Sequence, residues 1–212
     1  MFILTESIEF PPVAYADTDG LLAIGGDLST DRLIFAYRNG IFPWYNEGQP
    51  ILWFSPDPRM VLFPNELKIS KSMRQILRKK AFEVTFNSNF EEVIYNCATI
   101  NRPDQEGTWI TTDMQNAYKK MFDLGYAISV EVWKENTMVG GLYGIWLEEK
   151  RIFCGESMFS TMSNASKYGF IMLVEWLQQK DVKLIDCQVH TDHLSSLGAR
   201  EIPRDEFLKY LK

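Results

Sequence analysis

The sequence predicts a mixed α/β (α+β) fold, with a small N-terminal lobe over residues 1–64 and a larger domain with a mixed sheet over residues 65–212. Three observations lead to this prediction. Glycine, proline and aromatic residues interrupt the first segment too often for long regular elements. Residues 127–160 read as consecutive strands, which indicates an antiparallel meander. Residues 151–190 read as strand, helix, strand, and two strands joined by one helix lie parallel.

The composition is typical of a soluble globular protein and narrows the functional classes. The 212 residues carry a net charge of -6, which argues against indiscriminate nucleic-acid binding but allows a local basic patch. The N-terminus lacks the basic region of a signal peptide, and no apolar run approaches the roughly 20 residues of a membrane span. Three cysteines, Cys97, Cys154 and Cys187, are too few for a disulfide framework. We therefore expect a cytoplasmic protein without membrane contact.

The N-terminal lobe should contain one short helix. Residues 30–40 have helical apolar spacing, with Asp27 or Ser29 as the N-cap and Gly40 as the stop. The prolines that follow exclude further long elements. Trp44 and Trp53 belong to a group of large rings in this lobe, which either pack into a core or stack on nucleic-acid bases.

The segment 68–80 is the sharpest electrostatic feature of the chain. It contains six basic residues and no acidic residue: Lys68, Lys71, Arg74, Arg78, Lys79 and Lys80. Apolar residues from Ile69 to Leu77 recur at helical spacing, so one face should dock on the protein while the basic face points outward. Such a face is either simply solvated or binds a polyanion, and its isolation on an acidic protein favours the polyanion.

Local signals also predict the elements that follow. A strand over residues 82–88 should lead into a helix over 90–99 with Asn89 as its N-cap. After a loop over 101–110, a second helix should run from Thr112 or Asp113 to a stop at Gly125.

The meander over residues 127–160 should turn at residues 135–136 and 148–149. Asn164 or Ser163 should cap the next helix, which is apolar on nearly all sides and therefore mostly buried. A strand over 182–190 follows. The chain should then end in a loop over 193–203 and a short helix over 204–212.

Three polar residues of the strand–helix–strand unit need an explanation: Glu156, Asp186 and Gln188. Strand alternation places Asp186 and Gln188 on one face of their strand. Polar groups near the inside of such a unit are costly unless they are hydrogen-bonded or used. They are either structural groups at strand ends or members of a functional site, and the pattern alone leaves both interpretations open.

Other standard chemistries fit the sequence less well. Residues 187–193 contain a C-x2-H-x-D-H pattern that resembles a zinc site, but the sequence has no second cluster of ligands. Cys154 and Cys187 have apolar neighbours, which does not suit a nucleophilic thiol. An acyl-CoA enzyme should carry a glycine-rich pyrophosphate turn, and the corresponding segment 157–167 has no glycine. We therefore expect neither a metal nor a cofactor.

A series of ordered motifs resembles the leucyl/phenylalanyl-tRNA–protein transferase family. They run from GGDLS at residues 25–29 through GIFPWY, WFSPDPR, EGTWIT, VGGLYG, FCGESMFS, NASK and LIDCQV to SLGAREIPR at residues 196–204. The resemblance implies an N-acetyltransferase-like (GNAT) fold for the larger domain, which the predicted order of elements also suggests.

The resemblance also implies an activity. Members of the family transfer leucine or phenylalanine, with methionine as a further candidate here, from aminoacyl-tRNA to proteins with N-terminal Arg or Lys. The product is a signal for regulated degradation. The alternatives are a small-molecule N-acyltransferase of the same fold and an RNA-binding module without activity.

Residue roles follow from the same resemblance. Asp186 and Gln188 match the catalytic pair, with Gln188 either taking the α-amino proton or orienting the amine. Glu156 matches the residue that binds the N-terminal side chain of the acceptor. Trp44 and Trp109 match positions that stack on the terminal adenosine. The aminoacyl pocket corresponds to seven apolar residues: Leu142, Phe153, Met158, Phe170, Leu173, Leu177 and Ile185. Five basic residues should bind tRNA phosphates: Lys71, Arg74, Arg78, Lys79 and Lys80.

Overall fold

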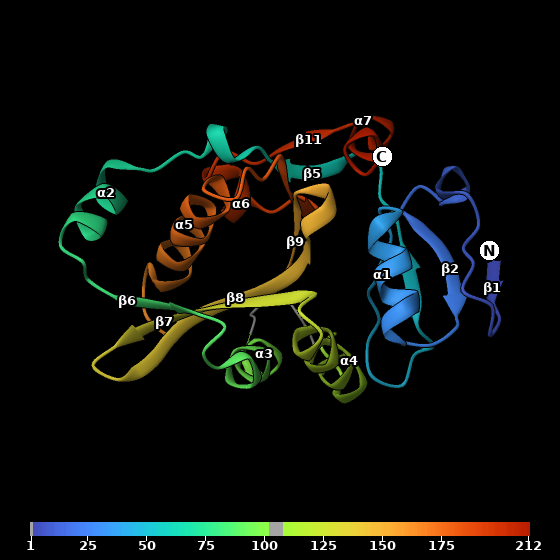
Figure 1. The fold of residues 1–212 in the computed structure, drawn as a ribbon, viewed down its shortest axis with the longest axis horizontal. Helices are drawn as coiled ribbons and strands as arrows, with labels where there is room; N and C mark the ends of the chain where they lie inside the picture. Colours follow the sequence, from blue (N-terminus) through green and yellow to red (C-terminus); the bar gives the residue numbers. More distant parts are fainter. Residues whose placement is uncertain (1, 102–107) are drawn as a thin grey trace.

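Two β-sheets organise the chain in a computed structural model, which describes residues 2–101 and 108–212 (Figure 1). The strands are β1 (Phe2–Leu4), β2 (Leu21–Gly25), β3 (Phe42–Pro43), β4 (Leu52–Phe54), β5 (Arg59–Leu62), β6 (Glu83–Phe86), β7 (Ala127–Lys134), β8 (Thr137–Leu147), β9 (Ile152–Ser160), β10 (Leu184–Gln188) and β11 (Arg200–Ile202). The helices are α1 (Thr30–Arg38), α2 (Lys71–Arg78), α3 (Phe90–Thr99), α4 (Thr112–Asp123), α5 (Ala165–Gln178), α6 (Asp192–Ser196) and α7 (Arg204–Tyr210).

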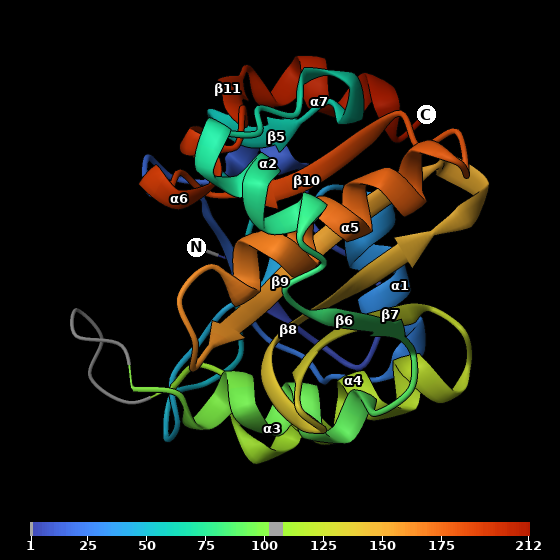
Figure 2. The same ribbon diagram turned by 90° about the vertical axis from the view of Figure 1, so that its left-hand side faces the viewer.

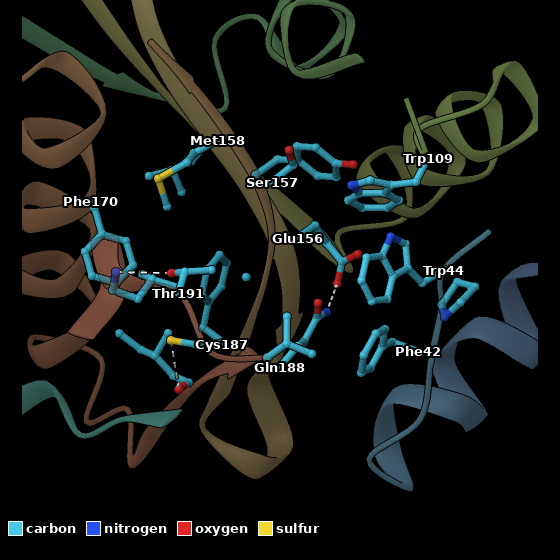
Figure 3. Close-up of a pocket in the computed structure, with 18 residues that line it drawn as sticks. Phe42, Trp44, Trp109, Glu156, Ser157, Met158, Phe170, Cys187, Gln188 and Thr191 are labelled. Carbon is cyan, nitrogen blue, oxygen red and sulfur yellow. Dashed lines mark hydrogen bonds between the residues drawn. The ribbon is translucent and has the colours of Figure 1, made fainter. Parts of the chain in front are cut away.

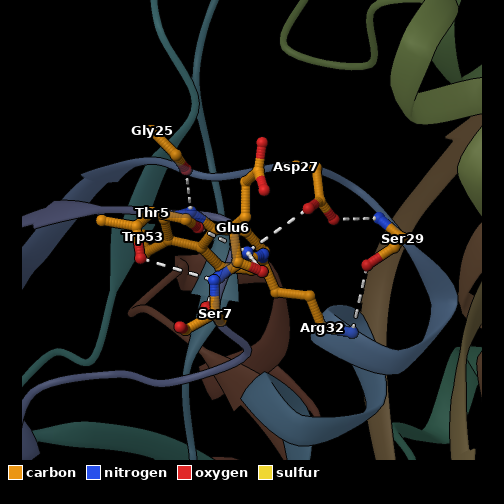
Figure 4. A network of polar contacts seen from close by, with 8 residues as sticks. All are labelled: Thr5, Glu6, Ser7, Gly25, Asp27, Ser29, Arg32 and Trp53. Atoms are coloured by element: carbon orange, nitrogen blue, oxygen red, sulfur yellow. Dashed lines mark hydrogen bonds and ion pairs between the residues drawn. The ribbon is translucent and has the colours of Figure 1, made fainter.

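The N-terminal lobe is built on the smaller sheet, whose order is β1-β2-β4-β3. Ser29 caps α1 as predicted, because its side chain accepts the backbone N–H of Arg32. The Arg32 side chain is fully buried and draws the preceding chain onto the helix (Figure 4). Its Nη2 donates to the Thr5 carbonyl at 2.8 Å and lies 3.3 Å from Asp27. Carbonyls and one carboxylate thus bind the terminal nitrogens of this buried cation.

The larger sheet has the order β11-β5-β10-β9-β8-β7-β6. The strands β9 and β10 are parallel, as predicted for strands joined by one helix, and the other neighbours are antiparallel. Figures 1 and 2 show α5 on one face of this sheet and α3 and α4 on the other. The buried side chains form two clusters: one combines residues of the N-terminal lobe, α3 and α4, and the other includes those of α5.

Strand β5 lies before the division predicted at residue 64, yet it pairs with β10 and β11 in the larger sheet. The larger sheet therefore includes residues that precede the predicted boundary, from Arg59 onward. This placement brings the segment after the proline-rich stretch next to the strand that carries Asp186 and Gln188.

Local signals are reproduced where they involve neighbouring residues. Asn89 caps α3 through its side chain, and Gly125 follows α4 with a φ of 81°. The turn between β7 and β8 uses Glu135 and Asn136, both with positive φ, as a two-residue hairpin requires. The second predicted turn is a single 3₁₀ turn over Glu148–Lys150.

Other details differ from the predictions. The helix α2 is shorter than the basic segment, whereas α4 begins at Thr112, one of its two predicted starts, with Thr111 as its N-cap. Asn164 does precede α5, but in a left-handed conformation and without a side-chain cap. The predicted loop 193–203 contains part of α6 and all of β11. Of the predicted loop 101–110, residues 102–107 lie outside the described residues.

Among the helices of the described residues, none has the length and apolar character needed to cross a bilayer.

Candidate active site

A cavity of about 260 Å³ lies where segments from both parts of the chain converge (Figure 3). Its walls come from β3 and the residue after it, from Trp109, from β8, β9 and β10, and from α5 and α6. The lining is mainly apolar. Figure 3 shows Met158 and Phe170 on one side, Trp44 and Trp109 on the other, and Glu156 between them.

The apolar side contains most of the residues predicted to form an aminoacyl pocket. Five of the seven line the cavity: Leu142, Phe153, Met158, Phe170 and Ile185. Leu173 and Leu177 do not line it. They lie further along α5, have no exposed surface and pack in the core. Helix α5 is apolar on nearly all sides because it is buried. Its pocket-lining and core positions therefore carry the same kind of residue, and the sequence alone does not distinguish them.

Glu156 and Gln188 meet in the cavity wall. Gln188 Nε2 donates to Glu156 Oε1 at 3.0 Å, and the Tyr118 hydroxyl of α4 donates to Oε2 at 2.8 Å. The Tyr118 hydroxyl also bonds to that of Tyr37 of α1. Both oxygens of Glu156 therefore have donors, which fixes the orientation of the carboxyl group.

Burial raises the pKa of Glu156 to about 8, and the neighbouring Asp186 carboxylate acts in the same direction. Hydrogen bonds from Tyr37, Tyr118 and Gln188 oppose this rise in the pKa without cancelling it. Burial also raises the pKa of both tyrosines well above the ordinary value, so their hydroxyls stay neutral. A cation beside Glu156 would favour the ionised carboxylate and release its proton.

Asp186 is buried and paired with Arg59. Arg59 Nε and Nη2 donate to Asp186 Oδ1 and Oδ2 at 2.8 and 2.7 Å. Both side chains are 1% exposed. Asp186 Oδ1 also accepts the backbone N–H of Gln188 at 2.9 Å. Asp186 does not line the cavity, but its carboxylate is bonded to the backbone of Gln188, which does.

Two β-bulges determine how the polar residues face the cavity. In β9, Glu156 is the extra residue opposite Tyr143 and Gly144 of β8. In β10, Cys187 is the extra residue opposite β5, and Gln188 follows with a left-handed φ of 63°. A bulge re-aims neighbouring side chains and is common beside active sites. The simple alternation assumed from the sequence is therefore interrupted at both strands.

Trp44 and Trp109 line the same cavity. Trp44 is 43% exposed, and its ring lies 5.7 Å from that of Phe54. An indole supported from behind and open in front suits stacking on an unpaired base.

The five basic residues predicted to bind tRNA lie on or just after α2, and all are exposed. None lines the cavity. Met73, on the other side of the helix, is buried, so the helix docks through its apolar face as predicted. Among the described residues, the ion pairs of the protein involve other side chains.

The alternative chemistries have little geometric support. Within residues 2–101 and 108–212, no three His, Cys, Asp or Glu side chains gather as a metal site requires. His190, which belongs to the zinc-like pattern, instead contacts a serine: its Nε2 lies 3.1 Å from Ser195 Oγ. Burial raises the pKa of the Cys154 and Cys187 thiols, which opposes the thiolate form that a nucleophile needs.

Sequence reasoning missed three polar residues of the site: Arg59, Tyr37 and Tyr118. One signal was available for Arg59, a single charge at the start of the apolar run Met60–Leu62. The tyrosines occupy ordinary amphipathic helix positions, and nothing local distinguishes them.

Comparison with known proteins identifies the class and then the family. Residues 61–212 match the family model described as leucyl/phenylalanyl-tRNA protein transferase, and residues 26–57 match the model of its N-terminal domain. The protein is therefore a transferase. The chain belongs to the leucyl/phenylalanyl-tRNA–protein transferase family, which confirms the resemblance seen in the motifs.

Relatives that carry the family name match the whole chain. One from Christiangramia forsetii is 60% identical over 211 residues, and one from Flavobacterium psychrophilum is 57% identical over 212 residues. Each match covers 100% of both chains. Among solved structures, a GCN5-related glucosamine N-acetyltransferase region of a fungal β-N-acetylglucosaminidase has a TM-score of 0.42 and 14% identity. That match covers 69% of this chain and 20% of the other.

Proposed function

We propose that this protein transfers leucine or phenylalanine from aminoacyl-tRNA to the α-amino group of proteins that begin with Arg or Lys. Methionine is a further donor to test. The observation that carries the proposal is one cavity that joins an apolar wall to the Glu156–Gln188 corner. A donor side chain and an acceptor cation would then lie side by side, with the reacting groups between them.

The apolar wall accounts for the donor. Met158 and Phe170 offer flexible and aromatic surface to a γ-branched, unbranched or aromatic side chain. A charged side chain placed there would lose its hydration without gaining a partner. The wall therefore selects by size and polarity.

Glu156 accounts for the acceptor. A guanidinium or ammonium group beside it would form a charge-assisted hydrogen bond. The Tyr118 and Gln188 bonds hold the carboxyl group in place before the acceptor arrives. This preorganisation reduces the ordering that binding must otherwise impose.

The transfer itself requires little proton chemistry. The α-amine attacks the ester carbonyl carbon, a C–N bond forms, and the C–O bond to the terminal ribose breaks. The amine proton ends on the ribose oxygen or on water. Since the ester is already activated, holding the amine near the carbonyl supplies much of the acceleration. We assign Gln188 to this orienting role, because a side-chain amide is a very weak base.

Two further surfaces would hold the tRNA. Trp44 and Trp109 would stack on its terminal adenosine, and the exposed cations of α2 would bind backbone phosphates. No cofactor is needed. We place the reaction in the cytoplasm, where charged tRNA and new N-termini meet, and where the added residue marks the acceptor for degradation.

The direct test incubates the protein with radiolabelled Leu-tRNA and a casein-like acceptor. We expect acid-precipitable, RNase-resistant label, and competition by peptides that begin with Arg or Lys. Transfer to acceptors regardless of their first residue would contradict the role of Glu156.

Two rival functions predict other results. A small-molecule N-acyltransferase would bind coenzyme A and acylate small amines without tRNA. An RNA-binding module would bind charged tRNA and leave the label on it. Both assays use the same intact protein, so one preparation separates the three functions.

A further inference from the structure

Arg59 joins three separate parts of the fold at one point. Its guanidinium binds both oxygens of Asp186 on β10, and its Nη1 donates to the Gly40 carbonyl after α1 at 3.1 Å. The same group lies 4.8 Å from the ring of Phe42 on β3 and 4.7 Å from the ring of Phe207 on α7. Hydrogen bonds in its plane and aromatic rings near it fix the guanidinium in all directions.

This fixed group controls the backbone that carries Gln188. Asp186 Oδ1 accepts both Arg59 Nε–H and the backbone N–H of Gln188. Gln188 has a left-handed φ, which residues other than glycine adopt only where the surroundings hold them. From that conformation its amide reaches Glu156 across the cavity wall. Arg59 therefore holds Asp186, Asp186 holds the β10 bulge, and the bulge orients Gln188.

We propose that Arg59 is a positioning residue of the transfer reaction: it holds the β10 bulge in the conformation that presents Gln188 to Glu156 and to the acceptor amine. Asp186 is then an anchor between Arg59 and Gln188. Its two oxygens are engaged and its surface is buried, so it does not reach substrate. This inference rests on the proposed function of the cavity, and its test therefore includes a measurement that needs no transfer activity.

Lysine is not equivalent to arginine at this position. A guanidinium presents two parallel donors to the two oxygens of a carboxylate, whereas an ammonium is a point charge. Arg59→Lys should keep the charge and lose the two-point hydrogen bonding. Arg59→Gln removes both and leaves a buried carboxylate without its partner.

Arg32 provides a matched control. It is the other fully buried arginine among the described residues, and carbonyls and Asp27 bind it (Figure 4). Neither Arg32 nor these partners line the cavity. Arg32→Gln should therefore destabilise the N-terminal lobe to a similar degree without moving Gln188.

The experiment measures single-turnover transfer from saturating Leu-tRNA to an Arg-starting peptide, together with hydrogen exchange of the peptide segment 184–189. For Arg59→Gln we expect the rate to fall by about tenfold or more, as lost positioning predicts, with tRNA affinity within about twofold. In this variant the backbone amides of segment 184–189 should exchange faster, while those of β7 and β8 stay protected. Arg59→Lys should lie between this variant and the native protein. Arg32→Gln should melt earlier and transfer at the native rate.

Three outcomes would overturn the inference. A folded Arg59→Gln with a native transfer rate is one, and unchanged exchange of segment 184–189 is the second. Equal loss of rate in Arg32→Gln at equal loss of stability is the third. If Arg59→Gln does not fold, the double variant Arg59→Gln/Asp186→Asn, whose two side chains are uncharged, is measured instead. We expect the same fall in its transfer rate, and a native transfer rate would contradict the inference. Hydrogen exchange is measured without tRNA. It therefore tests whether Arg59 holds the β10 bulge even if the protein does not catalyse the proposed transfer.

Discussion

At the scale of one side chain, the acceptor-binding role proposed for Glu156 sets two opposing demands. Burial raises its pKa to about 8, which favours the neutral acid, whereas binding a cation needs the carboxylate. Hydrogen bonds from Tyr118 and Gln188 keep the group oriented in either state. Acceptor binding and proton release should therefore be coupled.

The first prediction concerns this coupling. Binding of Nα-acetyl-arginine amide, whose α-amine is blocked, should weaken as the pH falls below about 8, because Glu156 must then lose a proton to pair with the guanidinium. Titration calorimetry in two buffers of different ionisation enthalpy should detect close to one released proton at pH 7. In Glu156→Gln the affinity should be lower and independent of pH over the same range. Equal proton release by the variant would assign it to another group.

The second prediction separates the two roles of Gln188. If Gln188 orients the amine, Gln188→Ala should lower kcat by roughly 100-fold or less, and the deficit should persist from pH 6 to pH 9. A deficit that disappears as the peptide amine deprotonates would show that Gln188 takes the proton. Gln188→Glu is a less direct variant, because it would place a second carboxyl about 3 Å from Glu156. Single-turnover rates with saturating charged tRNA decide between the roles.

At the scale of elements, the predictable features are those set by neighbours in the sequence. The caps at Ser29 and Asn89 and the hairpin at Glu135–Asn136 follow from local hydrogen bonds and backbone preferences. The bulges at Glu156 and Cys187 do not, because a bulge is defined by its partner strand and the partner is set by the tertiary fold. The strand–helix–strand pattern singled out Glu156 and Gln188 and the family resemblance suggested their roles, but simple alternation could not predict the two bulges.

The third prediction concerns α2. The double variant Lys71→Glu/Arg74→Glu should weaken tRNA binding and lower its salt dependence, by about 1 in the logarithmic slope for each phosphate that the variant no longer neutralises. The fold should persist, because both side chains are exposed and the helix docks through Met73. The matched control is Lys183→Glu/Lys209→Glu, an equal charge change at exposed lysines elsewhere. An unchanged salt slope for α2, or the same weakening in the control, would contradict the assignment.

At the scale of the whole molecule, the site depends on contacts between residues far apart in the chain. Arg59 reaches Asp186 on a distant strand, and Tyr37 of the N-terminal lobe bonds to Tyr118, which in turn donates to Glu156. No local pattern encodes such pairs, which is why the sequence indicated the carboxylates but not their partners. Leu173 and Leu177 show a second limit. Apolar residues of a pocket and of a core are the same residue types, so the sequence alone could not tell that these two lie in the core.

The last prediction uses the stability of the whole protein as its measurement. In the unfolded chain Glu156 has a pKa near 4.5, and in the folded protein its pKa is about 8. Between these pH values the folded state binds a proton that the unfolded state has lost, so the stability of the native protein falls as the pH rises, and the loss is complete above about 8. Glu156→Gln imitates the protonated form at nearly constant volume. It should therefore melt several degrees above the native protein at pH 9, and the difference should shrink toward pH 5.

Another buried glutamate tests whether this gain is specific to the cavity. Glu131 has no exposed surface, and its carboxylate accepts the hydroxyls of Thr85 and Ser129 at 2.7 and 2.6 Å. Each Glu131 oxygen also accepts a backbone N–H, from Ser88 or Asn89, so Glu131→Gln would place an NH₂ group against one of these donors and should lower the melting temperature at both pH values. Opposite signs for the two variants at pH 9 would identify Glu156 as a carboxyl group held for binding at the expense of stability. If Glu156→Gln melts no higher than the native protein at pH 9, burial does not oppose ionisation at this position, and the coupling to acceptor binding fails with it.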